Sequence, residues 1–148
     1  MGHVFGGRVL KNTLGLKKIG TFKSEIVSIK EVPKGYNISY SNEYKTKKDT
    51  KIAVVPVGYM DGLNVKNNRD SFNFKDNFLS ICMEIKKLFT KPSLKVIIRN
   101  RKYNVIGRLG MYHAIIDISG ADDIALGDEV ILQIAPIYTN LNIRREYI

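Results

Sequence analysis

The sequence contains one cysteine, Cys82, and no tryptophan. A single cysteine excludes an intrachain disulfide framework and a cysteine-rich metal site, as is typical of a reducing compartment. The two histidines, His3 and His113, have no partner at metal-ligand spacing, so we expect no metal site. The longest strongly apolar stretch, at 52–60, contains a proline and falls far short of the roughly 20 residues that a membrane helix needs. We therefore expect a cytoplasmic protein without a membrane partner.

Acidic residues are also few, since 14 Asp and Glu stand against 24 Lys and Arg, and the formal net charge at pH 7 is +10. Such a charge favours phosphates, nucleic acid or other acidic partners, but it does not define a fold. Hydrophobic residues make up 44% of the 148 residues, which is enough for a packed core in one domain. The composition therefore predicts one basic, folded domain.

Alternation of apolar and polar residues predicts strands near the start of the chain. Residues 20–32 read as one half-buried strand rich in β-branched side chains. A Pro-Lys-Gly turn then separates it from 35–40, where the alternation places Tyr36, Ile38 and Tyr40 on one side. We expect the polar, cationic stretch that follows to be a solvated connection or ribbon.

The rest of the chain continues the strand pattern with one interruption. The apolar run at 52–58 predicts a buried strand, and Pro56 indicates an end, an edge or a bulge. From Asp76, apolar residues recur at intervals of four, three and four, which predicts an amphipathic helix over about 76–90. Strand periodicity then returns in LKVIIRN, KYNVIGRLG, AIIDI and EVILQIA. The expected fold class is therefore mainly β, a small β barrel or sandwich domain with one amphipathic helix.

Three segments place tyrosine or methionine beside small or turn residues: ISYSNEYK at 38–45, VVPVGYMDG at 54–62 and IGRLGMYHA at 106–114. Taken one at a time, each has a structural explanation, because tyrosine in a strand is more often a core or rim residue than a catalyst. Cys82 lies on the apolar face of the expected helix, where a small buried hydrophobe is the simpler interpretation. No single segment assigns a function.

Taken together and in this order, the segments resemble the C-terminal β domain of the PLP-dependent alanine racemases, over roughly residues 20–148. The family's Ser-Tyr-Gly stands here as SYS at 39–41, and its Val-Pro-Val-Gly-Tyr-Ala-Asp-Gly stands as VPVGYMDG at 55–62. Its Gly-Arg-x-Cys/Ser-Met-Asp stands as GRLGMY at 107–112, and its Gly-Asp-x-Val as GDEV at 127–130. The block at 55–62 is the most specific of the four.

The resemblance implies roles for four residues. In these racemases two proton carriers flank the α-carbon, a PLP-bearing lysine of the barrel and a tyrosine from the partner subunit's β domain. Tyr40 matches that catalytic tyrosine. By the same resemblance, Met111, Tyr59 and Arg108 bind substrate: Met111 offers its backbone N–H to the substrate carboxylate, Tyr59 lines the substrate channel and Arg108 lies beside it. The resemblance assigns no cofactor-binding residue in this chain.

Departures from the family pattern concern the substrate pocket. Gly110 stands where the family has Cys or Ser, and Tyr112 stands where it has Asp, which changes the shape and charge of the pocket. Ile143 is the nearest equivalent of a family tyrosine that reaches the cofactor phosphate. These differences leave alanine and serine both open as the substrate.

The resemblance also implies a larger protein. In the family, a barrel of more than 200 residues precedes the β domain and holds PLP. Residues 1–19 form an irregular segment that resembles the end of that barrel, and 20–148 form the β domain. The expected partners are the barrel domain of the same or a partner subunit, within a homodimer, and a small amino-acid substrate. We expect the 148-residue chain to be inactive without the barrel and to bind no PLP covalently.

Two alternatives belong to other functional classes. The chain could be a basic β-barrel module that binds single-stranded nucleic acid, with Tyr36, Tyr40 and Tyr44 as stacking platforms. The lysines that would follow the phosphates are Lys45, Lys47, Lys48 and Lys51. This alternative explains the charge but not the VPVGYMDG block. The other alternative is a structural dimerisation domain, which a solution mass measurement would reveal.

Overall fold

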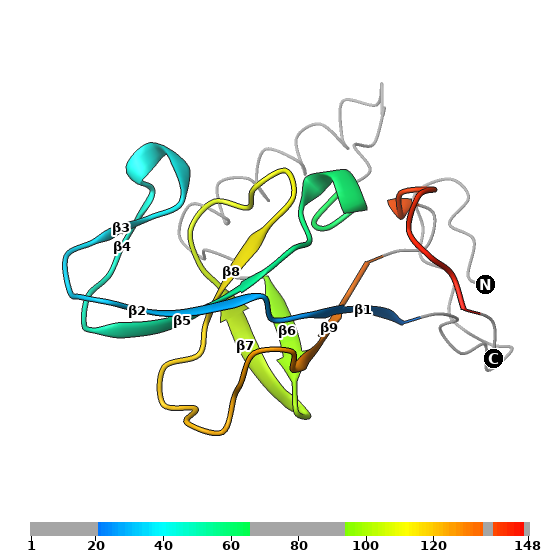
Figure 1. Ribbon diagram of the computed structural model, residues 1–148. Coiled ribbons are helices and arrows are strands. Elements are labelled where there is room, and N and C mark those ends of the chain that lie inside the picture. Colours follow the sequence, from blue (N-terminus) through cyan, green and yellow to red (C-terminus); the bar gives the residue numbers. More distant parts are fainter. Residues whose placement is uncertain (1–20, 66–93, 135–137, 147–148) are drawn as a thin grey trace, which may run out of the picture. The chain divides into compact units, whose positions relative to one another are not determined.

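The computed structural model of the protein describes residues 21–65, 94–134 and 138–146 (Figure 1). Two sequence predictions lie outside the described residues: the irregular N-terminal segment at 1–19 and the helix over about 76–90.

All described residues belong to one of two compact units of the chain, 21–65 with 93–148. This unit is built on a seven-stranded antiparallel sheet in the order β1-β9-β6-β7-β8-β5-β2. The strands are β1 (Phe22–Glu25), β2 (Ser28–Val32), β5 (Thr50–Val55), β6 (Lys95–Ile98), β7 (Arg101–Val105), β8 (Ala114–Asp117) and β9 (Glu129–Leu132). The prediction of a mainly β fold is therefore confirmed.

The sheet curls into a half-barrel because its two edge strands are neighbours in the sequence (Figure 1). Only Ile26 and Val27 separate β1 from β2. The Ile26 N–H donates to the Asp128 carbonyl beside β9, whereas the Val27 N–H donates to the Val54 carbonyl in β5. The single strand predicted at 20–32 is thus two strands, since successive backbone groups at this point pair with opposite ends of the sheet.

The hydrophobic core is formed by apolar side chains on the inward-facing side of the strands. Burial alternates along β6 and β8, as expected for strands with one face toward the interior. The predicted strand at 52–58 is observed as β5, which ends at Val55, directly before Pro56. The four later strand patterns are observed as β6 to β9. The fully buried large side chains are Ile26, Val55, Leu63, Val96, Ile98, Ile116, Ile118 and Val130.

A small hairpin extends from this sheet and carries the first of the three motifs. It comprises β3 (Asn37–Ile38) and β4 (Tyr44–Lys45), with the 3-10 helix η1 (Tyr40–Asn42) at its tip (Figure 1). The expected alternation over 35–40 is wrong: Ile38 is buried, whereas Tyr36 and Tyr40 are 61% and 60% exposed. The strand ends at Ile38 because the backbone turns at Ser39, where φ is +70°.

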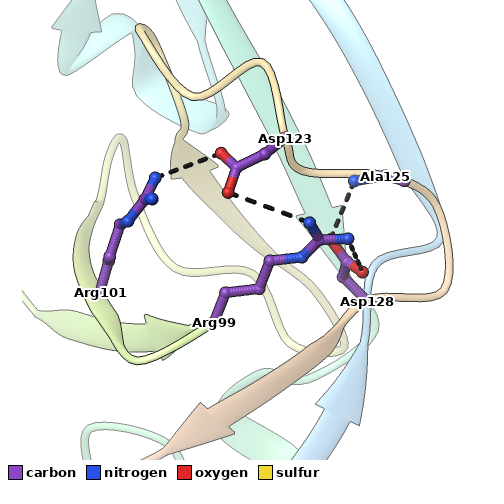
Figure 2. A network of polar contacts seen from close by, with 5 residues as sticks. All are labelled: Arg99, Arg101, Asp123, Ala125 and Asp128. Atoms are coloured by element: carbon purple, nitrogen blue, oxygen red, sulfur yellow. Dashed lines mark hydrogen bonds and ion pairs between the residues drawn. The ribbon is translucent and has the colours of Figure 1, made fainter.

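A network of charged side chains braces the turn between β6 and β7 (Figure 2). Arg99 and Asn100 form this two-residue turn, both with positive φ, as the twist of a tight hairpin requires. Arg99 pairs with Asp128 at 2.9 Å and with Asp123 at 3.9 Å, and Arg101 pairs with Asp123 at 3.2 Å.

The Arg99 guanidinium lowers the pKa of the Asp128 carboxyl through a hydrogen bond, and the Ala125 N–H lowers it further. The Ala125 N–H donates to Asp128 Oδ2 at 2.9 Å, so this carboxylate also closes the turn that leads into β9. The GDEV block therefore has a structural explanation in this part of the chain.

In the described segments, no helix combines the length and the apolar character required to cross a lipid bilayer.

Candidate functional site

The segments around Tyr40 and Arg108 are joined by a side-chain hydrogen bond and by close backbone packing. Ser39 Oγ donates to the main-chain carbonyl of Arg108. Directly before Arg108, Gly107 has φ +70°, and a Cβ at this position would lie 2.8 Å from Ser39 Cβ and 3.0 Å from the Ile38 carbonyl oxygen. Glycine is required here both for the backbone conformation and for the space. The segment that carries Tyr40 is therefore held against the loop that precedes β8.

The segment around Tyr59 joins the same loop through its backbone. The Tyr59 N–H donates to the Gly110 carbonyl at 3.1 Å, and the Met60 N–H donates to the Met111 carbonyl at 3.0 Å. A Cβ on Gly58 would lie 2.3 Å from the Met111 carbonyl oxygen, so this approach needs glycine. The three motifs, which lie far apart in the sequence, thus meet through the loop at 106–113.

The VPVGYMDG block is a turn whose shape depends on two residues that the sequence analysis did not single out. Asp61 Oδ2 accepts a hydrogen bond of 2.8 Å from the Gly58 N–H, which caps the 3-10 helix η2 (Tyr59–Asp61). Gly62 follows with φ +90°, and a Cβ there would lie 2.2 Å from the Tyr138 carbonyl oxygen. The spacing of Asp and Gly around Tyr59 was the signal that could have identified this turn.

The four residues predicted to act on substrate all have exposed side chains. Tyr40, Tyr59 and Met111 are 60%, 41% and 54% exposed. The Arg108 side chain is also exposed, and its Nη1 lies 3.5 Å from Glu43 Oε1, next to η1. The Met111 carbonyl accepts from Met60, while the Met111 N–H has no acceptor among the residues that the structure describes. These residues form an open surface, not an enclosed pocket.

Tyr40 packs against His113. The sequence analysis considered His113 only as a metal ligand and rejected that role. The ring centroids of Tyr40 and His113 lie 6.0 Å apart, with an angle of 49° between the ring planes. His113 follows directly after the GRLGMY block, and its carbonyl accepts a hydrogen bond of 3.0 Å from the Gly110 N–H.

The arrangement offers a phenol hydroxyl that can carry a proton and a main-chain N–H that can bind an anion. No group of His, Cys, Asp or Glu among the described residues has the geometry to hold a metal ion. A hollow of about 430 Å³ beside β1 is lined by other residues: Lys23, Ser24, Glu25, Pro56, Gly127 and Glu129. The open surface around Tyr40 is therefore the candidate site.

Comparison with known proteins relates this surface to a family. Residues 19–142 match the family described as the C-terminal domain of alanine racemase. An alanine racemase of Clostridium tetani is 34% identical over 131 residues, which are 88% of this chain and 28% of that protein. An alanine racemase of Halothermothrix orenii is 35% identical over 126 residues, which are 84% of this chain and 27% of that protein. The chain thus spans little more than a quarter of the length of these relatives.

Solved structures agree with the sequence relatives. The alanine racemase of Clostridium difficile 630 in complex with cycloserine superposes with a TM-score of 0.63 and 33% identity, covering 93% of this chain and 30% of that one. The curled sheet, the order of the motifs and the match over most of the chain lead to one conclusion. This chain belongs to the alanine racemase C-terminal domain family.

Proposed function

We propose that the chain is the C-terminal domain of a PLP-dependent racemase that interconverts L- and D-alanine, and that it supplies Tyr40 as a proton carrier. The observation that supports this most is the position of Tyr40. Its ring is exposed at the tip of the β3–β4 hairpin, and the backbone before it is tied to the loop that carries Met111. A proton carrier has to reach its substrate in a defined geometry, and this surface provides both exposure and support.

The other three residues have roles that follow from what they present on this surface. The Met111 N–H, which has no acceptor among the described residues, is suited to bind the carboxylate of an amino acid. Tyr59 lies on the turn that is hydrogen-bonded to Gly110, so it stands next to that N–H as a wall of the substrate channel. Arg108 pairs with Glu43, the residue that follows η1, and its exposed guanidinium is proposed to lie beside the substrate channel.

PLP, which the family implies, stabilises the negative charge left on the α-carbon when the proton is removed. The described donors are a phenol, an amide N–H and a paired guanidinium, a set that suits a surface facing a cofactor-bound amino acid. We name none of these residues as the holder of PLP, and we propose that the barrel domain holds it.

The exposed apolar residues support a partner for this surface. Tyr40, Tyr59, Met60, Met111 and Tyr112 are all more than 40% exposed, and they come from the three segments that the hydrogen bonds join. Large exposed apolar side chains on segments that are joined in this way are characteristic of an interaction site. We propose that it meets the barrel domain of a partner subunit in a homodimer, and that the chain is inactive without that barrel.

The substrate is proposed to be alanine because the named relatives are alanine racemases. Gly110 and Tyr112 differ from the family pattern in this part of the surface, and serine is the alternative they leave open. Relative kcat/KM values for the two amino acids in the full-length enzyme distinguish the two substrates.

Binding of single-stranded nucleic acid is the competing function, and the structure supports it less well. Of the three tyrosines proposed as stacking platforms, Tyr44 packs against the small buried cluster of Ile38, Ile52 and Ile106. An oligonucleotide titration over a series of salt concentrations tests this function. Micromolar or tighter binding at physiological salt that weakens steeply as salt rises would favour nucleic acid over racemisation.

The decisive experiment is Tyr40→Phe in the full-length, PLP-loaded racemase that contains this domain. We expect racemisation to fall about 10²- to 10⁴-fold, the range for loss of one acid–base group, with cofactor absorbance retained. Tyr36→Phe is the matched control, because Tyr36 is equally exposed but lies outside the three joined segments. Wild-type rates in both directions for Tyr40→Phe would overturn the proposal.

A further inference from the structure

We propose that His113 is a positioning residue that holds the Tyr40 ring in its working orientation. Gly110 allows this because it has no side chain and leaves the space that the imidazole occupies. This inference rests on the proposed function of Tyr40. It assigns a role to two residues that lie outside the four predicted to act on substrate.

The contact between the rings is of a kind that fixes orientation. A centroid separation of 6.0 Å and a tilt of 49° lie within the range of favourable tilted aromatic pairs. The Tyr40 side chain is 60% exposed, and His113 is the one ring in contact with it among the described residues. Loss of the imidazole would therefore remove the one aromatic contact, among the described residues, that restricts rotation of the phenol about its side-chain bonds.

The imidazole can serve as a support because its own backbone is firmly held. The His113 carbonyl accepts from the Gly110 N–H at 3.0 Å, which closes the turn before β8. The next residue, Ala114, is 1% exposed and pairs with Val55 in the centre of the core. His113 therefore projects from the end of a buried strand, whereas Tyr40 projects from the tip of a two-stranded hairpin.

Gly110 is the reason that the imidazole can lie where it does. A Cβ on Gly110 would come within 2.7 Å of His113 Cε1, 2.9 Å of Nδ1 and 2.9 Å of Nε2. Any side chain at position 110 therefore has to displace the ring. A side chain moves more easily than backbone, so we expect the displacement to cost little stability while it removes the support of Tyr40.

The proposed role is packing and not proton transfer, since no hydrogen bond joins the Tyr40 hydroxyl to the imidazole in the described structure. Two consequences follow. A phenyl ring at position 113 should take over the packing role of the imidazole. The losses of rate caused by substitutions at 110 and at 113 should not be additive, because both substitutions remove the same contact.

The experiment uses His113→Ala, His113→Phe, Gly110→Ala and the double variant Gly110→Ala/His113→Ala. In the PLP-loaded full-length racemase, we expect the two single alanine variants to lower kcat about tenfold or more in both directions, because each direction uses Tyr40 either as base or as acid, with KM nearly unchanged. We expect His113→Phe to restore most of the rate, and the double variant to match His113→Ala. Additive losses, or no rescue by phenylalanine, would overturn the packing role.

A second readout does not depend on activity. NMR of the 148-residue chain with labelled tyrosine and histidine should show a nuclear Overhauser contact between the Tyr40 and His113 rings, and Gly110→Ala should abolish it while the core signals persist. Absence of this contact in the wild-type chain would overturn the inference. If Tyr40→Phe is inactive while His113→Ala and Gly110→Ala retain wild-type kcat, the proposed function stands and the role of His113 fails.

Discussion

Ser39 Oγ donates a hydrogen bond to the main-chain carbonyl of Arg108, and this bond joins two parts of the candidate site that are 69 residues apart in the sequence. Ser39 has φ +70° and ψ −167°, a backbone conformation that residues other than glycine rarely adopt and that costs about 1–3 kcal/mol. The strain lies directly before Tyr40. It is retained because the hydrogen bond and the close approach of Gly107 hold this segment in place.

Two substitutions of Ser39 distinguish the contribution of the hydrogen bond to stability from the cost of the backbone strain. Ser39→Ala keeps the unfavourable backbone conformation and loses the bond, so we expect unfolding free energy to fall by about 0.5–1.5 kcal/mol in urea denaturation. Ser39→Gly loses the same bond but adopts this conformation readily, and it should be the more stable of the two variants. The reverse order of stability would show that the backbone at position 39 is not strained.

Gly58→Ala should disturb the site through the backbone. The added Cβ would lie 2.3 Å from the Met111 carbonyl oxygen and 2.4 Å from that of Gly110, and neither can move without breaking the hydrogen bonds to Tyr59 and Met60. We expect a loss of about 1–3 kcal/mol in unfolding free energy. Gly110→Ala is the comparison, because its Cβ meets a movable imidazole and should cost less. Equal stability of the two variants would contradict this account.

The ion pair between Arg99 and Asp128 should make stability depend on pH. Arg99 lowers the pKa of Asp128 in the folded protein, so this carboxylate contributes stability above its unfolded pKa of about 3.9 and loses it as pH falls through the lower folded pKa. We expect Arg99→Gln to lower the melting temperature at pH 7, and the difference from wild type to shrink as the pH falls below about 4.

Lys23→Gln provides the control for this measurement. Lys23 and Glu129 also form a close pair, at 2.8 Å, but both side chains are more than half exposed, and such pairs contribute little. The Asp128 side chain is only 17% exposed and accepts a second hydrogen bond from Ala125. A larger effect of Lys23→Gln than of Arg99→Gln at pH 7 would be inconsistent with the bracing role of Arg99.

The 148-residue chain by itself should neither bind PLP covalently nor racemise alanine. In the proposed function, Tyr40 and the Met111 amide act on a substrate held by a barrel domain, and the lysine that bears PLP belongs to that barrel. The measurement is the absorbance of the chain mixed with PLP, followed by borohydride reduction and mass spectrometry of its lysines. A specific cofactor adduct on one lysine, or exchange of the alanine α-proton, would refute this prediction.

Most of the strands that the sequence predicted correctly are those whose own side chains decide their conformation. β5, β6, β8 and β9 are short apolar segments with many Ile and Val residues, and such side chains favour an extended chain with one buried face. The break at Ile26 could not be predicted in this way. The position of this break depends on which strands form the two edges of the half-barrel. Pairing between distant segments decides which strands these are.

The sequence by itself determined the family, the succession of strands and the glycines that allow three motifs to meet, because these are properties of residue type and order. Only the tertiary structure decided which tyrosines are exposed. Tyr40 and Tyr44 look alike in the sequence, yet Tyr44 packs on a buried cluster while Tyr40 lies open against His113. The physical reason is that burial and ring contacts arise between residues that chain folding brings together, and local sequence carries little information about them.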